Sequence, residues 1–519
     1  ASSSLRNLTS QDPSANVIVF MEGSTKLMAP DKRIPSRREA KSLRVDETRR
    51  EFLVRSAQGV GTVALASLLG SNSLTAASEP TGDGAWPGVV NPPHFVPRAK
   101  RIIYLYQAGG PSHVDVLDYK PKLEAMHGRK MPESLTRGQQ MTTMTSGQRL
   151  TLLRPHSPFA RFGESGQQIS TLLPHTGQIA DDICIIRSMQ TEQINHDPAH
   201  TFMNTGSIIN GRPSMGSWLV YGLGNESENL PGFVVMTSIG GGGDQPIAAR
   251  QWHSGFLPGR LQGVAFQSKG SPVHYLEPPP GVTLDDQGDL VSTIRSLNAA
   301  RNDVVRDPEI ATRISQYEMA FRMQTSVPEL MDLSDEPQHI KDMYGTEGAD
   351  GSFAANCLLA RRMAERGVRF IQLYHRGWDH HSSIRQKLKT VTGLVDRASA
   401  ALVMDLKQRG MLEDTLVIWG GEFGRTPMFQ GKGKQPGRDH HIRGFSMWLA
   451  GGGVRGGLTY GSTDELGYNA IENVVHVNDL HATMLHLLGI DHERFTYPYQ
   501  GRDFRLTDVG GRVAHGILA

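Results

Sequence analysis

Five polar clusters in this sequence hold the residue types that bind metal ions. Imidazole and carboxylate groups are common ligands of zinc and manganese, and closely packed carboxylates repel one another unless a cation lies between them. The clusters therefore point to metal chemistry. Their candidate residues are His113 and Asp115; Asn195, His196 and His200; Asp379, His380 and His381; Glu422 and Arg425; and Arg438, Asp439, His440 and His441.

A hydrogen-bonded polar network is the alternative to a metal site at these clusters. A lone histidine near a strand end more often makes structural hydrogen bonds than binds a metal. Five clusters in the loops of one sheet favour the metal site over the network. The two cysteines, Cys184 and Cys357, each lie in an apolar segment, which is typical of buried thiols. They are too few for a cysteine-based zinc site.

The elements that must position these clusters are strands and helices in alternation. Such alternation predicts a mainly parallel sheet covered on both faces, in which ligands bind beyond the carboxyl ends of the strands. Four clusters directly follow a predicted strand, and the fifth lies just before one. Apolar runs predict strands at about 101–106, 183–187, 233–236, 368–374, 415–419 and 445–450, and helices at about 352–366, 384–409 and 478–488.

Two segments fit this alternation poorly. Residues 120–170 are polar and rich in turns, and residues 239–345 mix glycine- and proline-rich loops with helical stretches. We expect both to be insertions over one end of the sheet. The main domain then spans residues 101–519 and follows a linker at 79–100. The formal net charge of only +2 gives no electrostatic reason to expect a nucleic-acid partner.

The first 78 residues contain the pattern of a targeting signal. Residues 1–47 are polar, lack an apolar period and are predicted to be disordered. The stretch TRREFL (48–53) then precedes an apolar run at 59–70. It resembles the twin-arginine export signal, so residues 48–78 are predicted to be a signal peptide read by the twin-arginine export machinery. The alternative is an ordinary amphipathic helix.

Export would place the mature protein in the periplasm or outside the cell. The apolar run is too short for a stable membrane anchor. Cleavage is expected near Ala76 and Ala77.

The clusters and their flanking residues resemble the alkaline-phosphatase/sulfatase superfamily. Within it, they are similar to a bacterial sulfatase-like family known as domain of unknown function 1501. The resemblance implies a three-layer αβα sandwich with a mainly parallel central sheet. It covers the chain from about Lys100 onward and rests on GGPSHVDVLD (109–118), NHDPAHTFMNTG (195–206), GWDHH (377–381), GGEFGRTP (420–427), GRDHHIRGFSMWLAGGG (437–453) and DLHATMLHLLGI (479–490).

The resemblance implies one or two divalent ions, with zinc, manganese and calcium as the candidates. In the superfamily, one metal site takes an aspartate and a histidine from a single loop and a late histidine. Asp379 with His380 or His381 matches the loop, and His440 or His441, which follow Asp439, matches the late histidine. The second site departs from the pattern, because Glu422-Phe423 replaces an aspartate–histidine pair and Gln107 replaces an aspartate. This site is either rebuilt from His113, Asp115 and Glu422 or absent.

The resemblance also implies a nucleophile near the start of the helix that follows the second strand. Thr191 is the candidate, with Ser188 and Ser112 as other hydroxyls; alternatively, Asn195 positions a metal-bound water. No cysteine lies there, so the modified-cysteine chemistry of true sulfatases is not supported.

The remaining candidates would bind the substrate or assist the reaction. Arg425 and Arg438 could clamp an anion with forked donors, or form ordinary ion pairs. His196 and His200 lie four residues apart, on one face if this stretch is helical, and could bind a metal, protonate a leaving group or brace the loop.

The predicted function is therefore an exported, metal-dependent hydrolase of phosphate or sulfate esters. Its substrate would be a small anionic ester or a sulfated or phosphorylated glycan. The alternative is a non-catalytic exported binding protein that keeps the fold and a metal or ligand. The replaced pair at Glu422 and the lack of an obvious nucleophile favour this alternative.

Overall fold

The computed structural model describes residues 87–519 except 146–149, 243–244, 274–280, 306–307 and 432–434. The chain divides into one unit at Ala1–Thr75 and a second at Ala76–Ala519, and all described residues belong to the second. The predicted extension at 1–47, the predicted signal peptide at 48–78 and the first part of the predicted linker lie outside the described residues.

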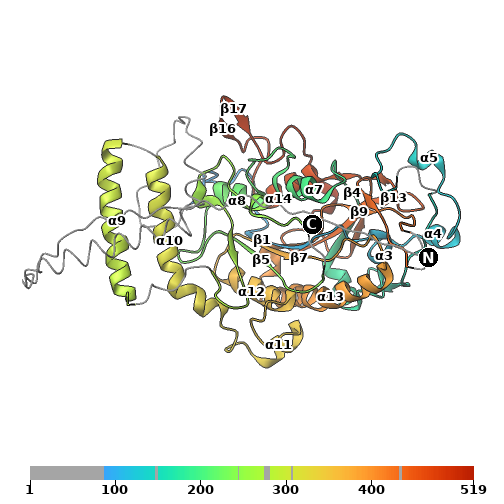
Figure 1. Ribbon diagram of the computed structural model, residues 1–519, viewed down its shortest axis with the longest axis horizontal. Coiled ribbons are helices and arrows are strands. Elements are labelled where there is room, and N and C mark those ends of the chain that lie inside the picture. Colours follow the sequence, from blue (N-terminus) through green and yellow to red (C-terminus); the bar gives the residue numbers. More distant parts are fainter. Residues whose placement is uncertain (1–86, 146–149, 243–244, 274–280, 306–307, 432–434) are drawn as a thin grey trace, which may run out of the picture. The chain divides into compact units, whose positions relative to one another are not determined.

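A central sheet of nine strands organises the described part of the chain (Figure 1). The strand order is β12-β4-β11-β8-β1-β7-β5-β6, and β15 also pairs with β4. Every pairing is parallel except those of β11, which runs antiparallel to both β4 and β8. The strands are β1 Arg101–Gln107, β4 Ile183–Gln190, β5 Phe233–Thr237, β6 Val264–Phe266, β7 Phe370–His375, β8 Thr415–Gly420, β11 Phe445–Ala450, β12 Leu458–Tyr460 and β15 Val475–His476.

Helices cover both faces of the sheet, with α12 and α13 on one face and α7, α8 and α14 on the other (Figure 1). The predicted three-layer α/β architecture with a mainly parallel sheet is therefore confirmed. The helices are α3 His113–Val116, α4 Pro121–Ala125, α5 Glu133–Thr136, α6 Pro174–Gln178, α7 His196–Thr205, α8 Met215–Leu223, α9 Leu284–Val305, α10 Pro308–Met331, α11 Gln338–Tyr344, α12 Phe353–Glu365, α13 Ile384–Gln408 and α14 Val477–Leu487.

The two faces of the sheet support two separate apolar cores. Side chains alternate between the faces of a strand, so Ile103 and Leu105 of β1 join the core under α12 and α13. Ile102 and Tyr104 join the core under α8 and α14. Every residue of β1 is buried, as expected for a parallel strand covered on both sides.

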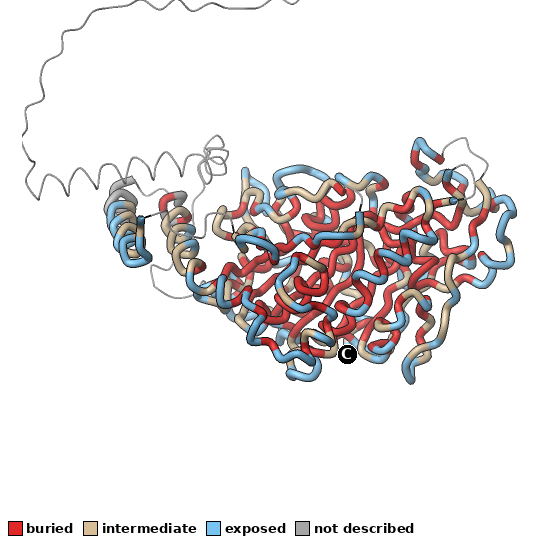
Figure 2. Tube along the Cα trace, turned by 60° about the horizontal axis from the view of Figure 1, so that its bottom comes forward, coloured by how far each residue is buried: buried red, intermediate tan, exposed pale blue. Residues whose placement is uncertain are grey.

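Both segments predicted as insertions carry structure of their own. The first contains the two-stranded ribbon of β2 Phe159–Phe162 and β3 Gln167–Ser170. The second contributes β6 to the edge of the central sheet and also contains the long helices α9 and α10. Figure 2 shows buried residues concentrated around the sheet, whereas the described residues of α9 are exposed or half-buried.

Short ribbons complete the fold: β9 Gly424–Arg425 with β10 His440–His441, β13 Ser462–Thr463 with β14 Ala470–Glu472, and β16 Tyr497–Tyr499 with β17 Arg502–Phe504. The β9–β10 ribbon carries one histidine of the candidate site described below. None of the helices in the described part of the chain is both long enough and apolar enough to cross a membrane.

Stability should depend far more on the sheet interior than on the small ribbons. Ile418 of β8 is fully buried, so I418A should lower the free energy of unfolding by about 2–5 kcal/mol through lost burial and a residual cavity. Ile471 of β14 is 64% exposed, and I471A should change the free energy of unfolding by less than about 0.5 kcal/mol. Urea unfolding followed by tryptophan fluorescence measures both. Equal effects would contradict the assignment of β8 to the core.

Candidate metal centre

The direction of the strands brings four loops and one ribbon to the same end of the sheet. Strands β1, β4, β7 and β8 are parallel, so the loops after them meet at their common carboxyl end. Strand β11 runs the opposite way, so the segment before it, which contains β10, reaches that end as well. This arrangement gathers residues from distant parts of the chain around Asp379.

The carboxylate of Asp379 lies between three imidazole rings. The Nε2 atom of His196 lies 3.2 Å from Oδ2 of Asp379. The Nε2 atom of His381 lies 2.8 Å from Oδ1, and that of His440 lies 3.3 Å from the same oxygen. His196 comes from the first turn of α7, His381 from the loop after β7 and His440 from β10.

The other ring nitrogen of each histidine contacts a fixed oxygen. The Nδ1 atom of His440 lies 2.7 Å from the backbone carbonyl of Ile194. That of His381 lies 2.5 Å from Oε1 of Gln430, and that of His196 lies 2.6 Å from Oε1 of Glu422. When Nδ1 donates its hydrogen to such an acceptor, the lone pair of Nε2 is free to bind a metal, an arrangement common around metal-ligating histidines.

Glu422 is buried at the start of the loop after β8 and orients His196. Its carboxylate accepts the backbone N–H of Gly109, at 3.0 Å to Oε1 and 3.2 Å to Oε2. This close approach requires glycine, because Gly109 has a φ of +119° and an added Cβ would lie 2.5 Å from the backbone nitrogen of Asp379. Burial by itself would raise the pKa of Glu422, but the nearby His200 and His196 lower it to about 2.

His200 lies one helical turn after His196, behind the centre. Its Nδ1 atom lies 2.8 Å from the hydroxyl of Tyr106 and 3.6 Å from Oε2 of Glu422. Its Nε2 atom lies 3.3 Å from Oε1 of Gln245. Burial is the main cause that lowers the pKa of His200, which favours a neutral ring.

Arg425 compensates the negative charge of Asp379 from the interior. The guanidinium group donates to Oδ1 of Asp379 at 2.6 Å and to the backbone carbonyl of Gly110 at 2.9 Å, and it also bonds to the carbonyl of Gly109. Burial would raise the pKa of Asp379, but the three imidazoles and Arg425 hold it far below its usual range. The Asp379 side chain is therefore an anion held in a fixed position.

The donor set fits a transition-metal ion. Among the described residues, two overlapping groups place their ligand atoms within 4.8 Å of one another: His196, Asp379, His381 and His440, and His196, His200 and Glu422. Three imidazoles with one carboxylate suit zinc, manganese or iron, whereas calcium prefers an all-oxygen site. In the first group, the Nε2 atom of His196 is buried, and it faces Oδ2 of Asp379, another ligand of the same group, at 3.2 Å.

The protonation states of the histidines differ within this centre. Burial is the largest cause that lowers the pKa of His440, to about 4, which favours a neutral ring. Burial also opposes protonation of His196, but contacts with Asp379 and Glu422 raise its pKa above the usual value. A proton and a metal ion therefore compete for His196.

The family model described as protein of unknown function (DUF1501) matches residues 99–518, which is most of the chain. The chain belongs to this family. The DUF1501 family predicted from the motifs is thereby confirmed. No curated protein sequence matches the chain.

Several solved structures are similar to this DUF1501 chain. The PsFucS1 sulfatase from Pseudoalteromonas sp. has 13% identity and a TM-score of 0.34, with 81% of this chain and 72% of that chain covered. The phosphonate monoester hydrolase SpPMH from Silicibacter pomeroyi has 12% identity and a TM-score of 0.27, with 61% of this chain and 68% of that chain covered. The lipoteichoic acid synthase LtaP from Listeria monocytogenes has 10% identity and a TM-score of 0.25, with 82% of this chain and 78% of that chain covered.

Each of the two His-His pairs of the DUF1501 chain contributes one residue to the centre. His380, beside His381, is buried, and its ring centroid lies 6.4 Å from that of Trp378. Neither of its ring nitrogens forms a hydrogen bond with another described residue. Burial lowers the pKa of His380 to about 3. His441, beside His440, stacks on Tyr468 at 4.0 Å and contacts its carbonyl through Nε2.

The predicted residues His113, Asp115 and Arg438 lie apart from the centre. Arg438 is buried and donates through Nε to Oδ2 of Asp115 at 2.6 Å. It also bonds to the backbone carbonyls of Leu153 and Arg154. The Nε2 atom of His113 lies 2.8 Å from the carbonyl of Gly467. In this structure, the three residues brace the fold around α3.

The predicted hydroxyls and Asp439 have separate environments. Asp439 accepts the backbone N–H of His440 at 2.8 Å and the hydroxyls of two threonines in the segment before β2. The hydroxyls of Ser188 and Ser112 donate to the carbonyl of Asn473 and to Asp115. The hydroxyl of Thr191 is buried and has no hydrogen-bond partner within the described part of the chain. Asn195 is exposed and directly precedes α7.

Three partners of the centre were not found from the sequence: Gln430, Tyr106 and Gln245. Gln430 lies in a glycine- and lysine-rich loop, and Gln245 beside a glycine-rich loop, where no periodic pattern marks one residue. Tyr106 reads as an ordinary strand residue within an apolar run. Each contacts a histidine of the centre or its neighbour, a relation that only the folded structure reveals.

The buried pair of Asp115 and Arg438 should matter for stability. R438M would leave the Asp115 carboxylate without its cation in a buried site, and should lower the free energy of unfolding by about 3–5 kcal/mol. The double variant D115L/R438M removes both charges and should recover most of that loss. Urea unfolding of R438M, D115L and the double variant tests this expectation. A loss in the double variant equal to the sum of the two single losses would show that the pair does not interact.

Proposed function

We propose that this protein is an exported, metal-dependent hydrolase of phosphate or sulfate esters, with one ion at the centre around Asp379. The observation that carries the proposal is the convergence of three Nε2 atoms on one ionised carboxylate, while each Nδ1 atom contacts a fixed oxygen. This pattern supports one ion rather than two, because Glu422 already holds the Nδ1 atom of His196.

A hydrolytic centre must also be open to its substrate. The side chains of Asp379 and His381 are each 28% exposed, so one side of the centre meets solvent. A divalent ion bound there would polarise an ester oxygen and lower the pKa of a bound water. The donor set favours zinc, manganese or iron over calcium.

Helix α7 adds an electrostatic preference for anions at the same place. His196 is its first residue, so the positive end of the helix dipole lies at the centre. The acidic Asp197 in the first turn is paired with Arg250, which limits its repulsion of an anion. A phosphate or sulfate ester would therefore be favoured there over a neutral ester.

The residues of the chain then take defined roles. Asp379, His381, His440 and His196 would hold the ion, and Glu422 would position His196. Arg425 would fix the Asp379 carboxylate rather than clamp the substrate, because its donors already bond to interior oxygens. Thr191 as the nucleophile and Asn195, His200 and Arg438 as substrate-binding residues stay predictions from the sequence.

The paired histidines provide matched variants for the metal site. H381A and H440A should each lower the bound metal, measured by elemental mass spectrometry, at least tenfold, because each removes one of four ligands. H380A and H441A remove the adjacent histidines and should leave metal content unchanged. Circular dichroism checks that each variant folds. Equal metal loss in H380A and H381A would contradict this assignment of ligands.

Hydrolysis is tested on the same proteins with aryl phosphates and aryl sulfates. Wild type loaded with the metal that it retains should turn over one of these series, and H381A should lose at least a hundredfold in kcat/KM, about 2.7 kcal/mol of transition-state stabilisation. Metal binding without hydrolysis of any ester would instead support the non-catalytic binding protein.

Export is tested at the arginine pair that precedes the apolar run. R49K/R50K should hold a tagged protein in the cytoplasm, because the resemblance to the twin-arginine signal depends on that pair. The other arginine pair of the N-terminal region has no apolar run after it, so R37K/R38K is the matched control. Cell fractionation and immunoblotting give the readout. Equal export of both double variants would contradict the proposed signal.

A further inference from the structure

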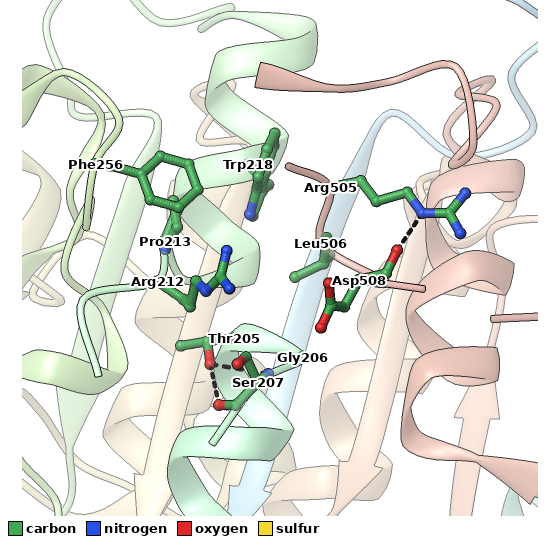
Figure 3. A pocket seen from close by; sticks show the side chains of 10 residues that line it. All are labelled: Thr205, Gly206, Ser207, Arg212, Pro213, Trp218, Phe256, Arg505, Leu506 and Asp508. Atoms are coloured by element: carbon green, nitrogen blue, oxygen red, sulfur yellow. Dashed lines mark hydrogen bonds between the residues drawn. The ribbon is translucent and has the colours of Figure 1, made fainter. Parts of the chain in front are cut away.

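The histidines of the metal centre are held in place in different ways. His196 begins α7, a helix of ten residues whose far end packs against the C-terminal segment of the chain (Figure 3). There Gly206 ends the helix with a φ of +68°, and the backbone carbonyl of Leu506 leaves no room for a Cβ atom on it. The position of His196 therefore follows from the packing of a whole helix.

His440 lies on a much smaller element. Strands β10 and β9 have two residues each and form a separate two-stranded sheet. A two-stranded ribbon is marginally stable by itself. Beyond the ribbon, the Nδ1 atom of His440 contacts the backbone carbonyl of Ile194 at 2.7 Å. The position of this ligand therefore depends strongly on the other contacts that hold the backbone of β10.

The side chain of Asp439 provides such contacts and joins β10 to a distant segment. Asp439 is only 1% exposed. Its Oδ1 atom accepts the backbone N–H of His440 at 2.8 Å, and its Oδ2 atom accepts the hydroxyls of Thr142 and Thr145. Thr142 and Thr145 lie 297 and 294 residues before Asp439, in the first of the two segments expected to be insertions. This carboxylate thus anchors the ribbon to the insertion.

These three hydrogen bonds use both oxygens of Asp439. Hydrogen bonds to a carboxylate are stronger than those between neutral groups, and a buried polar group that loses its partner is costly. Asp439 would have to give up these bonds to reach a metal ion. It belongs to neither of the possible ligand groups among the described residues. The predicted role of Asp439 as a metal ligand is therefore replaced by a role in support of its neighbour.

A second path connects the same segment to another ligand. Met144 lies between the two threonines, and its Sδ atom accepts the Nε2 group of Gln430 at 3.7 Å. The Oε1 atom of Gln430 lies 2.5 Å from Nδ1 of His381. Residues 142–145 form a turn, in which the N–H of Thr145 donates to the carbonyl of Thr142 at 3.2 Å. One short turn thus contacts the partners of two proposed ligands.

We propose that Asp439 is a positioning residue, which with Thr142 and Thr145 fixes His440 for metal binding. The inference rests on the proposed metal site and adds the residues that support one of its ligands. Without the two hydroxyls, the Asp439 side chain would lose its anchor, and β10 could shift relative to Asp379. Loss of such outer partners typically lowers metal affinity about 10–100-fold.

Cobalt(II) binding to the purified protein tests this role. T142V/T145V removes both hydroxyls with little change in side-chain volume and keeps Asp439 and all four proposed ligands. Competition with a chelator gives the dissociation constant, and the visible absorption of the cobalt-saturated protein reports the geometry around the ion. T142V/T145V should bind cobalt about tenfold or more weakly than wild type and should have an altered absorption spectrum.

Two further variants separate positioning from general stability. T142S/T145S keeps both hydroxyls and should restore the affinity and the spectrum of wild type. T176V removes another buried threonine–carboxylate bond, since Thr176 of α6 donates to Asp396 of α13 at 2.6 Å. It should lower the free energy of unfolding in urea and leave cobalt binding unchanged. If T142V/T145V does not fold by circular dichroism, T142V and T145V, which each keep one bond, should show a smaller loss of cobalt affinity.

The outcomes distinguish this inference from the proposed metal site. If wild type binds cobalt and the valine variants bind it with the same affinity and spectrum, the positioning role is overturned and the metal site stands. An equal loss of affinity in T176V, or no recovery in T142S/T145S, would also overturn it, because the effect would not come from the hydroxyls. Absence of cobalt binding in wild type would overturn the metal site and the positioning role together.

Discussion

The half-buried negative charge of Asp379 is the constraint on which the rest of the site depends. An unpaired carboxylate that is partly removed from water is costly, so it must be paired. Arg425 pairs with it from the interior, and the same guanidinium also holds the backbone of Gly109 and Gly110. Because Gly109 donates to Glu422, and Glu422 orients His196, one ion pair fixes three of the loops that form the centre.

The fold was predictable because strong local signals agree with the tertiary structure. The apolar runs at 101–106, 183–187 and 415–419 became β1, β4 and β8, each buried on both faces. A parallel sheet then requires the loops after these strands to meet at one end, so the gathering of the clusters was also predictable. The order of the strands and the reversed direction of β11 were not visible in the sequence.

The identity of the site residues was harder to predict because adjacent residues can face opposite ways. In β10, successive side chains point to opposite sides, so His440 reaches Asp379 while His441 reaches Tyr468. The sequence shows the His-His pair but not the side that each residue faces. Asp115 and Arg438 read as site residues for a similar reason, since their pairing joins positions 323 residues apart.

The residues around Asp379 come from nearly half the length of the chain, from His196 to His440. No short segment contains the set, so the centre exists only after β1, β4, β7, β8 and β11 have paired. Contacts of such long range form late and slowly during folding, because loop-closure entropy opposes them. An ion at this centre would thus bind the finished fold and not the unfolded chain, and would slow unfolding of the whole domain. Which metal ion the protein takes up would therefore be decided in the compartment where the chain folds.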